Sequence, residues 1–162
     1  MSYRIGTGID YHRLVEEREL WIGGVHIPYQ MGSLGHSDGD VLLHAICDAL
    51  LGALSLGDIG THFPDTDEKY RNIDSKLLLN ETYQMVLDLG YKVVNIDSTL
   101  LLEEPRIKPF IHLMQHTIAM VLKLPPTDIS IKATTTEKLG SIGRMEGLAA
   151  NATVLLKKDT ID

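Results

Sequence analysis

The chain has 162 residues, 44% of them hydrophobic, and 15 basic against 22 acidic residues give a net charge of −7. This composition predicts one globular domain over residues 1–162 and argues against a nucleic-acid surface, which needs concentrated basic residues. With Cys47 as its only cysteine the chain forms no intrachain disulfide. No stretch predicts a membrane span or a signal segment, so we expect a cytoplasmic protein, or a plastid protein whose leader was removed.

Hydrophobic periodicity and turn residues predict eight elements. In chain order they are strands at 3–10 and from 20 to Pro28, helices at 37–57 and 74–90, a strand at 92–104, a helix at 105–124, and strands at 128–136 and 148–158. Ser37 or Asp38 is the expected N-cap of the first helix, Asp74 caps the second, and a short helical turn is expected at 137–139. The order predicts an α+β fold, a two-layer sandwich of a mixed β-sheet with helices on one face.

The stretch TGIDYHR places Asp10 and His12 two residues apart in the first strand. Alternating strand residues share a face, so both side chains project toward one point. In the first helix, Asp40, His44 and Asp48 recur every four residues as a polar stripe on an otherwise apolar helix. Taken alone, His44 and Asp48 could simply bond each other or the backbone. With Asp10 and His12, His44 completes a three-ligand zinc set with an open fourth position, and Asp48 or a neighbour would orient its second nitrogen.

Two loops around the first helix carry further polar residues. His36 and Ser37 lie in a glycine-rich approach to the helix N-terminus, which suits an anion or a polyol, although ordinary capping explains it equally well. After the helix, Asp58, Asp65 and Asp67 crowd a short loop. Asx-turns account for part of this pattern, and hydrogen bonds to a hydroxylated substrate are the alternative.

A second polar centre follows the strand at 128–136. The hydroxyl groups of residues 134–136 could hold phosphate oxygens, and Glu137 could bind a hard cation that bridges them. A threonine N-cap followed by an acidic first turn is the structural alternative. Arg106 and Lys108 could reach a base or a phosphate, but a solvated helix start is the commoner explanation.

Several stretches together resemble the family of 2-C-methyl-D-erythritol 2,4-cyclodiphosphate synthases, enzymes of the non-mevalonate isoprenoid pathway. The stretches are RIGTGIDYH, IGGVHIPY, HSDGDVLLHAICDALLGALSLGDIGTHFPDTD, IKATTTEKLG and GRMEGLAA. The resemblance implies a lyase that cyclises 4-diphosphocytidyl-2-C-methyl-D-erythritol 2-phosphate in a metal-dependent intramolecular reaction and releases CMP. It also implies a homotrimer with active sites between subunits, one Zn²⁺ per subunit, and a second ion, Mg²⁺ or Mn²⁺.

The resemblance further implies a role for each site residue. The implied zinc ligands are Asp10, His12 and His44. Glu137 would bind the second ion, and His36 and Thr135 would stabilise the transition state. The residues implied for the methylerythritol side are Asp58, Ile59, Gly60, Phe63, Pro64, Asp65, Thr66 and Asp67. Those implied for cytidine and diphosphate are Leu102, Glu103, Glu104, Pro105, Arg106, Ile107, Lys108, Ala133, Thr134, Thr135, Thr136 and Glu137. Further implied substrate contacts are Ile9, Asp10, His12, Ser37 and Arg144.

The chain departs from the family pattern in two places. Ser141 and Ile142 replace an aromatic pair near the implied trimer axis, where the family can hold an isoprenoid diphosphate, and Arg106 stands in place of a lysine. The residues alone leave two other functions open. Zinc could activate water in a phosphoesterase that yields linear products. Zinc could instead be structural in a trimeric isoprenoid-diphosphate binder, although three ligands with an open position argue against that role.

Overall fold

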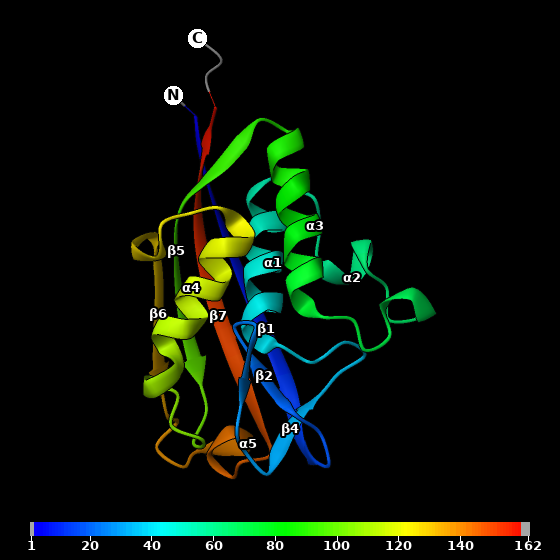
Figure 1. Cartoon of the computed structure of the whole chain (residues 1–162), viewed down its shortest axis with the longest axis vertical. Coiled ribbons are helices and arrows are strands. Elements are labelled where there is room, and N and C mark those ends of the chain that lie inside the picture. Colours follow the sequence, from blue (N-terminus) through cyan, green and yellow to red (C-terminus); the bar gives the residue numbers. More distant parts are fainter. Residues whose placement is uncertain (1, 160–162) are drawn as a thin grey trace.

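The computed structural model describes residues 2–159 and shows two layers, a β-sheet with helices packed on one of its faces (Figure 1). The strands are β1 (Tyr3–Glu16), β2 (Leu20–Ile22), β3 (Val25–Ile27), β4 (Met31–Leu34), β5 (Tyr91–Leu101), β6 (Ile129–Thr134) and β7 (Gly147–Lys158). The α-helices are α1 (Val41–Ala53), α2 (Ile59–His62), α3 (Ser75–Asp88), α4 (Ile111–Leu122) and α5 (Gly140–Gly143). Single 3₁₀ turns are η1 (Glu68–Tyr70), η2 (Lys108–Phe110) and η3 (Pro126–Asp128).

The main sheet has five strands in the order β4-β1-β7-β5-β6. Strands β5 and β6 are parallel and the other pairs are antiparallel, so the sheet is mixed. The last strand of the chain, β7, therefore lies in the middle of the sheet, between β1 and β5. The mixed sheet with helices on one face confirms the predicted α+β sandwich. Within residues 2–159 no helix is long and apolar enough to cross a membrane.

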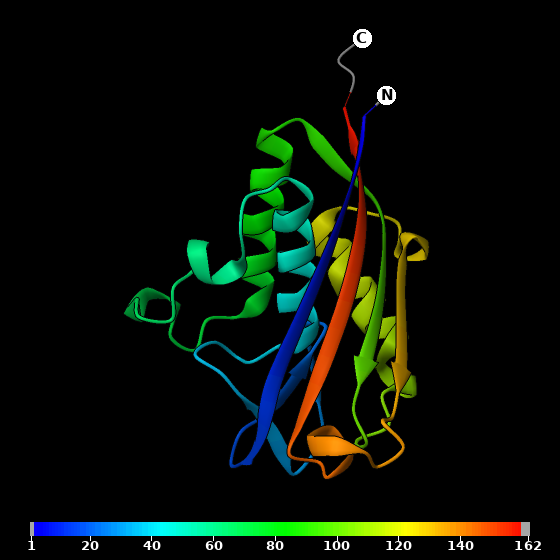
Figure 2. The same cartoon turned by 180° about the vertical axis from the view of Figure 1, so that it is seen from behind.

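Helix α1 packs against β1 so closely that the strand needs glycines at the contact. A Cβ atom on Gly6 would lie 1.9 Å from the backbone oxygen of Ala49, and one on Gly8 would lie 2.0 Å from that of Ala45. The residues of β1 that alternate with these glycines face the other side of the sheet, where no helix covers the strands (Figure 2). Ile5 is 69% exposed there. The strand thus has one face against α1 and one open apolar face.

The first third of the chain differs from the sequence-based prediction in three places. Strand β1 runs on to Glu16, six residues beyond the predicted end at residue 10. The strand predicted from residue 20 to Pro28 is a hairpin, because Gly23 and Gly24 adopt φ values of +60° and +73° and turn the chain between β2 and β3. Strand β4 was not predicted, because its four residues include no β-branched side chain. It nevertheless pairs with the end of β1 and extends the sheet by one edge strand.

The predicted N-cap of the first helix was wrong, and that of the second is confirmed. Asp40 caps α1 by accepting a hydrogen bond from the backbone N–H of Leu43. Asp38 does not cap α1, because its carboxylate accepts hydrogen bonds from Ser75 at the start of α3. Asp74 caps α3 as expected.

The short helical turn predicted at 137–139 lies three residues further along, at α5. Glu137 and Lys138 have φ values of 53° and 62°, which lie in the left-handed region and cannot continue a right-handed helix. The loop after β6 therefore turns back on itself before α5 begins.

Candidate active site

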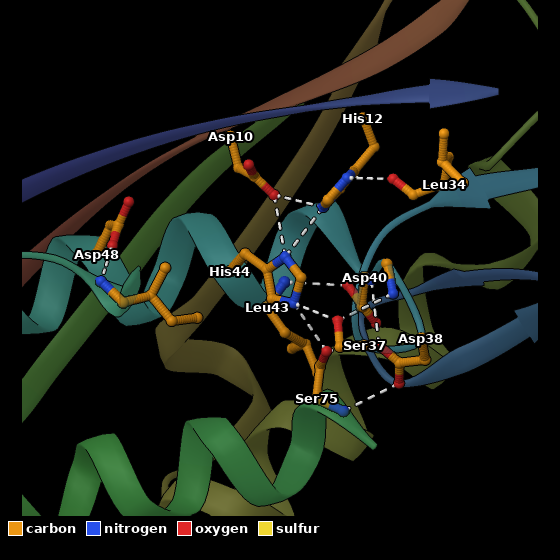
Figure 3. A network of polar contacts seen from close by, with 12 residues as sticks. Asp10, His12, Leu34, Ser37, Asp38, Asp40, Leu43, His44, Asp48 and Ser75 are labelled. Atoms are coloured by element: carbon orange, nitrogen blue, oxygen red, sulfur yellow. Dashed lines mark hydrogen bonds and ion pairs between the residues drawn. The ribbon is translucent and has the colours of Figure 1, made fainter. Parts of the chain in front are cut away.

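Three potential metal ligands converge where β1 crosses α1. Asp10 and His12 share the helix-facing side of β1, as the alternation predicts, and His44 rises toward them from the first turn of α1 (Figure 3). The Asp10 Oδ2 atom lies 2.9 Å from His12 Nε2 and 3.1 Å from His44 Nδ1, and the two nitrogens are 3.0 Å apart. The structure therefore brings together the three residues predicted as metal ligands.

The hydrogen bonds behind the ligands orient both imidazoles. His12 Nδ1 lies 3.0 Å from the carbonyl oxygen of Leu34, which can only accept, so this nitrogen carries the proton. The lone pair of neutral His12 at Nε2 then points at the Asp10 carboxylate. Two electron-rich atoms only 2.9 Å apart are stable together when a cation lies between them. The donor set, two imidazole nitrogens and one carboxylate oxygen, thus fits a divalent metal.

Charge interactions within this centre shift two pKa values in opposite directions. Burial alone would raise the pKa of Asp10, but hydrogen bonds and charge interactions with His12 and His44 outweigh it and lower that pKa. For His12, burial lowers the pKa, but the hydrogen bond and charge of Asp10 more than compensate, so the pKa is raised. A proton shared with Asp10 therefore stabilises the metal-free centre. A metal ion would displace that proton.

The carboxylates of Asp40 and Asp48, four residues before and after His44, both accept hydrogen bonds from backbone N–H groups. Asp48 Oδ1 accepts a hydrogen bond from the backbone N–H of Ile59 at 2.7 Å and fixes the start of α2. The sequence left open whether Asp48 or a neighbouring residue orients the second nitrogen of His44. In the structure, neighbouring residues do so. The hydroxyl oxygens of Ser37 and Ser75 lie 3.1 Å and 2.9 Å from His44 Nε2. The sequence did not predict Ser75 as a partner of His44, because its local pattern does not indicate that the start of α3 packs against α1.

A cavity of about 390 Å³ opens above the three ligands. Besides the ligands, it is lined by His36, Ser37, Ile59, Gly60, Phe63, Asp65, Tyr70 and Leu78. Four of the eight residues predicted for the methylerythritol side thus share one cavity, and Tyr70 and Leu78 are additions that the sequence did not suggest. The nitrogen His36 Nε2 lies 3.2 Å from the carbonyl oxygen of Asp67, which ties the two loops together.

The remaining predicted residues of this side lie at the edge or elsewhere. Asp58 caps α2, and the hydroxyl and backbone N–H of Thr61 lower the pKa of its carboxyl group. Pro64, Thr66 and Asp67 belong to the same loop but do not line the cavity. Ile9 faces the open side of the sheet and is 56% exposed, so its side chain points away from the cavity.

A second hollow of about 290 Å³ lies at the carboxyl ends of the parallel strands β5 and β6. Its lining consists of Leu102, Glu103, Pro105, Arg106, Ile107, Lys108, Ala133, Thr134 and Thr135. The predicted cytidine and diphosphate residues are therefore also brought together, with Glu104, Thr136 and Glu137 just outside the lining. In the described part of the chain, the two hollows share no lining residue.

Glu103 connects the two loops of this second hollow. Its Oε1 atom accepts hydrogen bonds from the backbone N–H groups of Thr136 at 2.9 Å and Lys138 at 3.2 Å. The Thr136 N–H is the main reason why the pKa of Glu103 is lowered. The backbone N–H of Glu137 in turn bonds the hydroxyl of Thr135 at 3.3 Å. These contacts hold the loop that carries Glu137.

The predicted substrate contact Arg144 belongs to neither hollow. Its guanidinium group pairs with Glu146 at 2.7 Å in the segment between α5 and β7. Ser141 and Ile142 line a third hollow, of about 210 Å³, beside Tyr11 on β1. The residues predicted near a trimer axis thus lie beside residues 11–13 of β1, and His12 belongs to the same lining.

Comparison with known proteins agrees with this geometry. The family model of the YgbB family matches residues 3–157. A 2-C-methyl-D-erythritol 2,4-cyclodiphosphate synthase of Bacteroides thetaiotaomicron is 57% identical over 159 residues, which cover 98% of this chain and all of the relative. The bifunctional IspDF of Campylobacter jejuni superposes with a TM-score of 0.94 at 46% identity, over 97% of this chain and 42% of that one.

A further solved structure, of Plasmodium falciparum IspF in complex with CDP, has a TM-score of 0.86 at 34% identity and covers 98% of both chains. These similarities extend over the strands and helices that carry both hollows. The chain therefore belongs to the YgbB family of 2-C-methyl-D-erythritol 2,4-cyclodiphosphate synthases, the lyases that form this cyclic diphosphate in isoprenoid biosynthesis.

Proposed function

We propose that Asp10, His12 and His44 bind one zinc ion and that the cavity above them folds the methylerythritol part of the substrate for cyclisation. The observation that carries this proposal is the convergence of one carboxylate oxygen and two ring nitrogens at about 3 Å from one another, on the floor of a 390 Å³ cavity. A zinc ion bound there would act as a Lewis acid toward the β-phosphate.

In the family's reaction, the 2-phosphate of 4-diphosphocytidyl-2-C-methyl-D-erythritol 2-phosphate attacks the β-phosphorus and CMP leaves. Both partners are anions, so charge repulsion and the closure of a flexible ring dominate the barrier. Asp58 and the loop 63–67 would orient the hydroxyl groups of the substrate, which is an entropic contribution. His36 and Thr135 would donate hydrogen bonds to the charge that develops in the transition state. The attacking phosphate is already ionised, so the site needs no general base.

The hollow at the carboxyl ends of β5 and β6 is the proposed site for cytidine and the diphosphate. Arg106 and Lys108 bring positive charge to its lining, and the CDP complex of the Plasmodium falciparum relative supports a nucleotide site in this fold. Glu137, next to this hollow, is the proposed ligand of a second ion, Mg²⁺ or Mn²⁺, because hard cations prefer carboxylate oxygens. That ion would neutralise charge on the departing CMP.

We further propose that the enzyme is a homotrimer in which adjacent subunits share each active site. Two observations support this assembly. The methylerythritol and nucleotide hollows lie on separate parts of one chain, and the open face of the sheet exposes the apolar side chains of Ile5, Ile9 and Tyr11.

An isoprenoid diphosphate at the trimer axis stays a prediction, with Ser141 and Ile142 as its nearest residues. A single domain over 1–162 and a cytoplasmic location complete the proposal, in line with the bacterial relative.

Phosphorus NMR of the purified protein with substrate, Zn²⁺ and Mg²⁺ tests the proposed function. We expect coupled cyclic-diphosphate resonances together with equimolar CMP, both lost after chelation and restored by zinc. His44→Ala should abolish the product while the protein stays folded, and His26→Ala, at an exposed histidine on β3, should retain it. CMP with a linear product would instead make the protein a hydrolase, and no CMP at all would contradict the proposal.

A further inference from the structure

The contacts behind His44 extend beyond the ligand itself. Ser75, the first residue of α3, is completely buried, and its hydroxyl oxygen lies 2.9 Å from His44 Nε2 (Figure 3). The same hydroxyl is bonded to Asp38 Oδ1, and the backbone N–H of Ser75 donates to Asp38 Oδ2 at 2.9 Å. We propose that Asp38 and Ser75 are positioning residues that fix the proton of His44 on Nε2 and so keep the Nδ1 lone pair directed at the metal centre. This inference rests on the proposed metal centre.

The direction of each hydrogen bond in this relay follows from the groups involved. An ionised carboxylate can only accept, so the single hydroxyl proton of Ser75 goes to Asp38. The oxygen of Ser75 then has only lone pairs to offer, and it must accept a proton from His44 Nε2. A neutral imidazole carries one proton, so Nδ1 is left as the lone pair that faces Asp10 and His12.

Ser37 contacts the same nitrogen but does not determine which ring nitrogen of His44 carries the proton. Its hydroxyl oxygen lies 3.1 Å from His44 Nε2 and accepts a hydrogen bond from the backbone N–H of Gly39. The proton of Ser37 therefore remains free, and Ser37 can either accept from His44 Nε2 or donate to it. If Ser75 were absent, His44 could carry its proton on Nδ1 and donate it to Asp10 Oδ2, which is 3.1 Å away. That proton would occupy the position of the metal.

The hydrogen bonds of the Asp38 carboxylate all come from donor groups. Besides the two groups of Ser75, its Oδ1 accepts from the backbone N–H of Asp40 at 3.2 Å. An asparagine at this position would direct its NH₂ group toward one of these donors. Asp38→Asn should therefore release the hydroxyl proton of Ser75 or weaken the start of α3. Asp38 also donates its own backbone N–H to the carbonyl of Ile73, so the segment is held in place independently of its carboxylate.

The first test is the affinity for zinc, measured by chelator competition on folded protein. We expect Ser75→Ala and Asp38→Asn to weaken zinc binding by about 10- to 100-fold, the usual effect of removing a group that orients a metal-bound histidine. Ser75→Thr keeps the hydroxyl and should restore most of the affinity. Ser37→Ala, which removes the other hydroxyl on the same nitrogen but leaves the relay intact, should retain zinc affinity.

The second test is ¹⁵N NMR of the histidine rings in the metal-free protein, which reports which ring nitrogen carries the proton. His44 should be protonated at Nε2 in the unaltered protein and gain an Nδ1–H signal in Ser75→Ala. His26, an exposed histidine on β3, is the internal reference and should not change. If Ser75→Ala does not fold, the same His44 signals are measured in Asp38→Asn.

The outcomes separate this inference from the proposed function. Unchanged zinc affinity and an unchanged His44 tautomer in folded Ser75→Ala or Asp38→Asn would overturn the positioning role while leaving the zinc centre intact. Failure of the unaltered protein to bind zinc would overturn the centre itself. An equal loss of affinity in Ser37→Ala would also count against the relay, because it would show that any hydroxyl group near His44 Nε2 acts in the same way.

Discussion

The thiol of Cys47 is fully buried in α1, and burial raises its pKa from 9.0 to about 12. The folded protein therefore keeps a neutral thiol over a pH range in which the unfolded chain forms a thiolate. Between about pH 9 and pH 12 the unfolded state binds fewer protons than the folded state, so the free energy of unfolding falls as the pH rises. Below pH 9 this group has no effect on the pH dependence.

We expect Cys47→Ala to lose the part of the alkaline destabilisation that comes from this thiol. Urea denaturation at pH 8, 9 and 10 gives the free energy of unfolding of both proteins. The difference between their slopes against pH is the contribution of Cys47. Tyrosines that ionise in the same range are common to both proteins and cancel. A thiol reagent should also leave Cys47 unmodified until the chain unfolds. Rapid labelling of the native protein would contradict the burial of the Cys47 thiol.

At the level of elements, the contact between β1 and α1 sets the spacing of the metal ligands. Gly8→Ala would place a methyl group 2.0 Å from the backbone oxygen of Ala45, where no side chain can move aside. We expect it to lower the free energy of unfolding by at least about 1–3 kcal/mol and to weaken metal binding, because β1 must move away from α1.

Gly52→Ala in α1 is the matched control. The nearest atom to its new methyl group is the backbone oxygen of Thr7 at 3.7 Å, which is an ordinary contact. A helix favours alanine over glycine by up to about 1 kcal/mol, so Gly52→Ala should be neutral or stabilising. Chemical denaturation of both variants gives the comparison. Equal stability of Gly8→Ala and the unaltered protein would mean that β1 and α1 are less closely packed than the structure has them.

The parts of the site that the sequence predicts are those that depend on local geometry. The period of two in β1 puts Asp10 and His12 on one face, and the apolar surroundings of His44 mark it as a buried polar residue that needs partners. The main helices and most strands follow from the same periodicities. The family resemblance then names the residues of both hollows, which periodicity cannot do.

What the sequence does not predict depends on contacts between distant segments. Ser75 resembles any first residue of a helix, and only the packing of α3 beside α1 brings it to His44. Strand β4 has weak strand propensity and exists because the end of β1 offers a free edge. The hairpin of β2 and β3 was missed for a different reason, since a turn at Gly23 and Gly24 divides what looks like one continuous strand.

At the level of the whole molecule, the uncovered face of the sheet is the proposed contact between subunits. Ile5→Asp would place a charge at a side chain that is 69% exposed in the single chain and would be buried in the proposed trimer. We expect this variant to sediment as a monomer and to lose activity. Met120→Asp, on the outer side of α4 where the side chain is 74% exposed, is the control and should remain trimeric. Monomeric unaltered protein, or a trimeric Ile5→Asp, would contradict the proposed interface.

Shared active sites make a further prediction about mixtures of inactive subunits. In the proposed site, His44→Ala removes a ligand of the zinc ion, and Glu137→Ala removes the ligand of the second ion on the nucleotide side. If adjacent subunits supply the two halves, trimers assembled at random from equal amounts of both variants contain on the order of one quarter intact sites. Co-refolding the two variants should then recover about that fraction of the activity. No recovery would place both halves of the site within one chain.

The position of β7 in the middle of the sheet has a consequence for how the chain folds as it is synthesised. Strands β1 and β5 each pair with β7, so neither has its full set of partners until the last residues of β7 have left the ribosome. Helix α1 can pack on β1 much earlier, since both belong to the first third of the chain. A nascent chain would thus hold the metal ligands close together before its sheet exists. A chain interrupted before β7 would leave most of β1 unpaired and one edge of β5 open, which exposes it to aggregation and to cellular proteases.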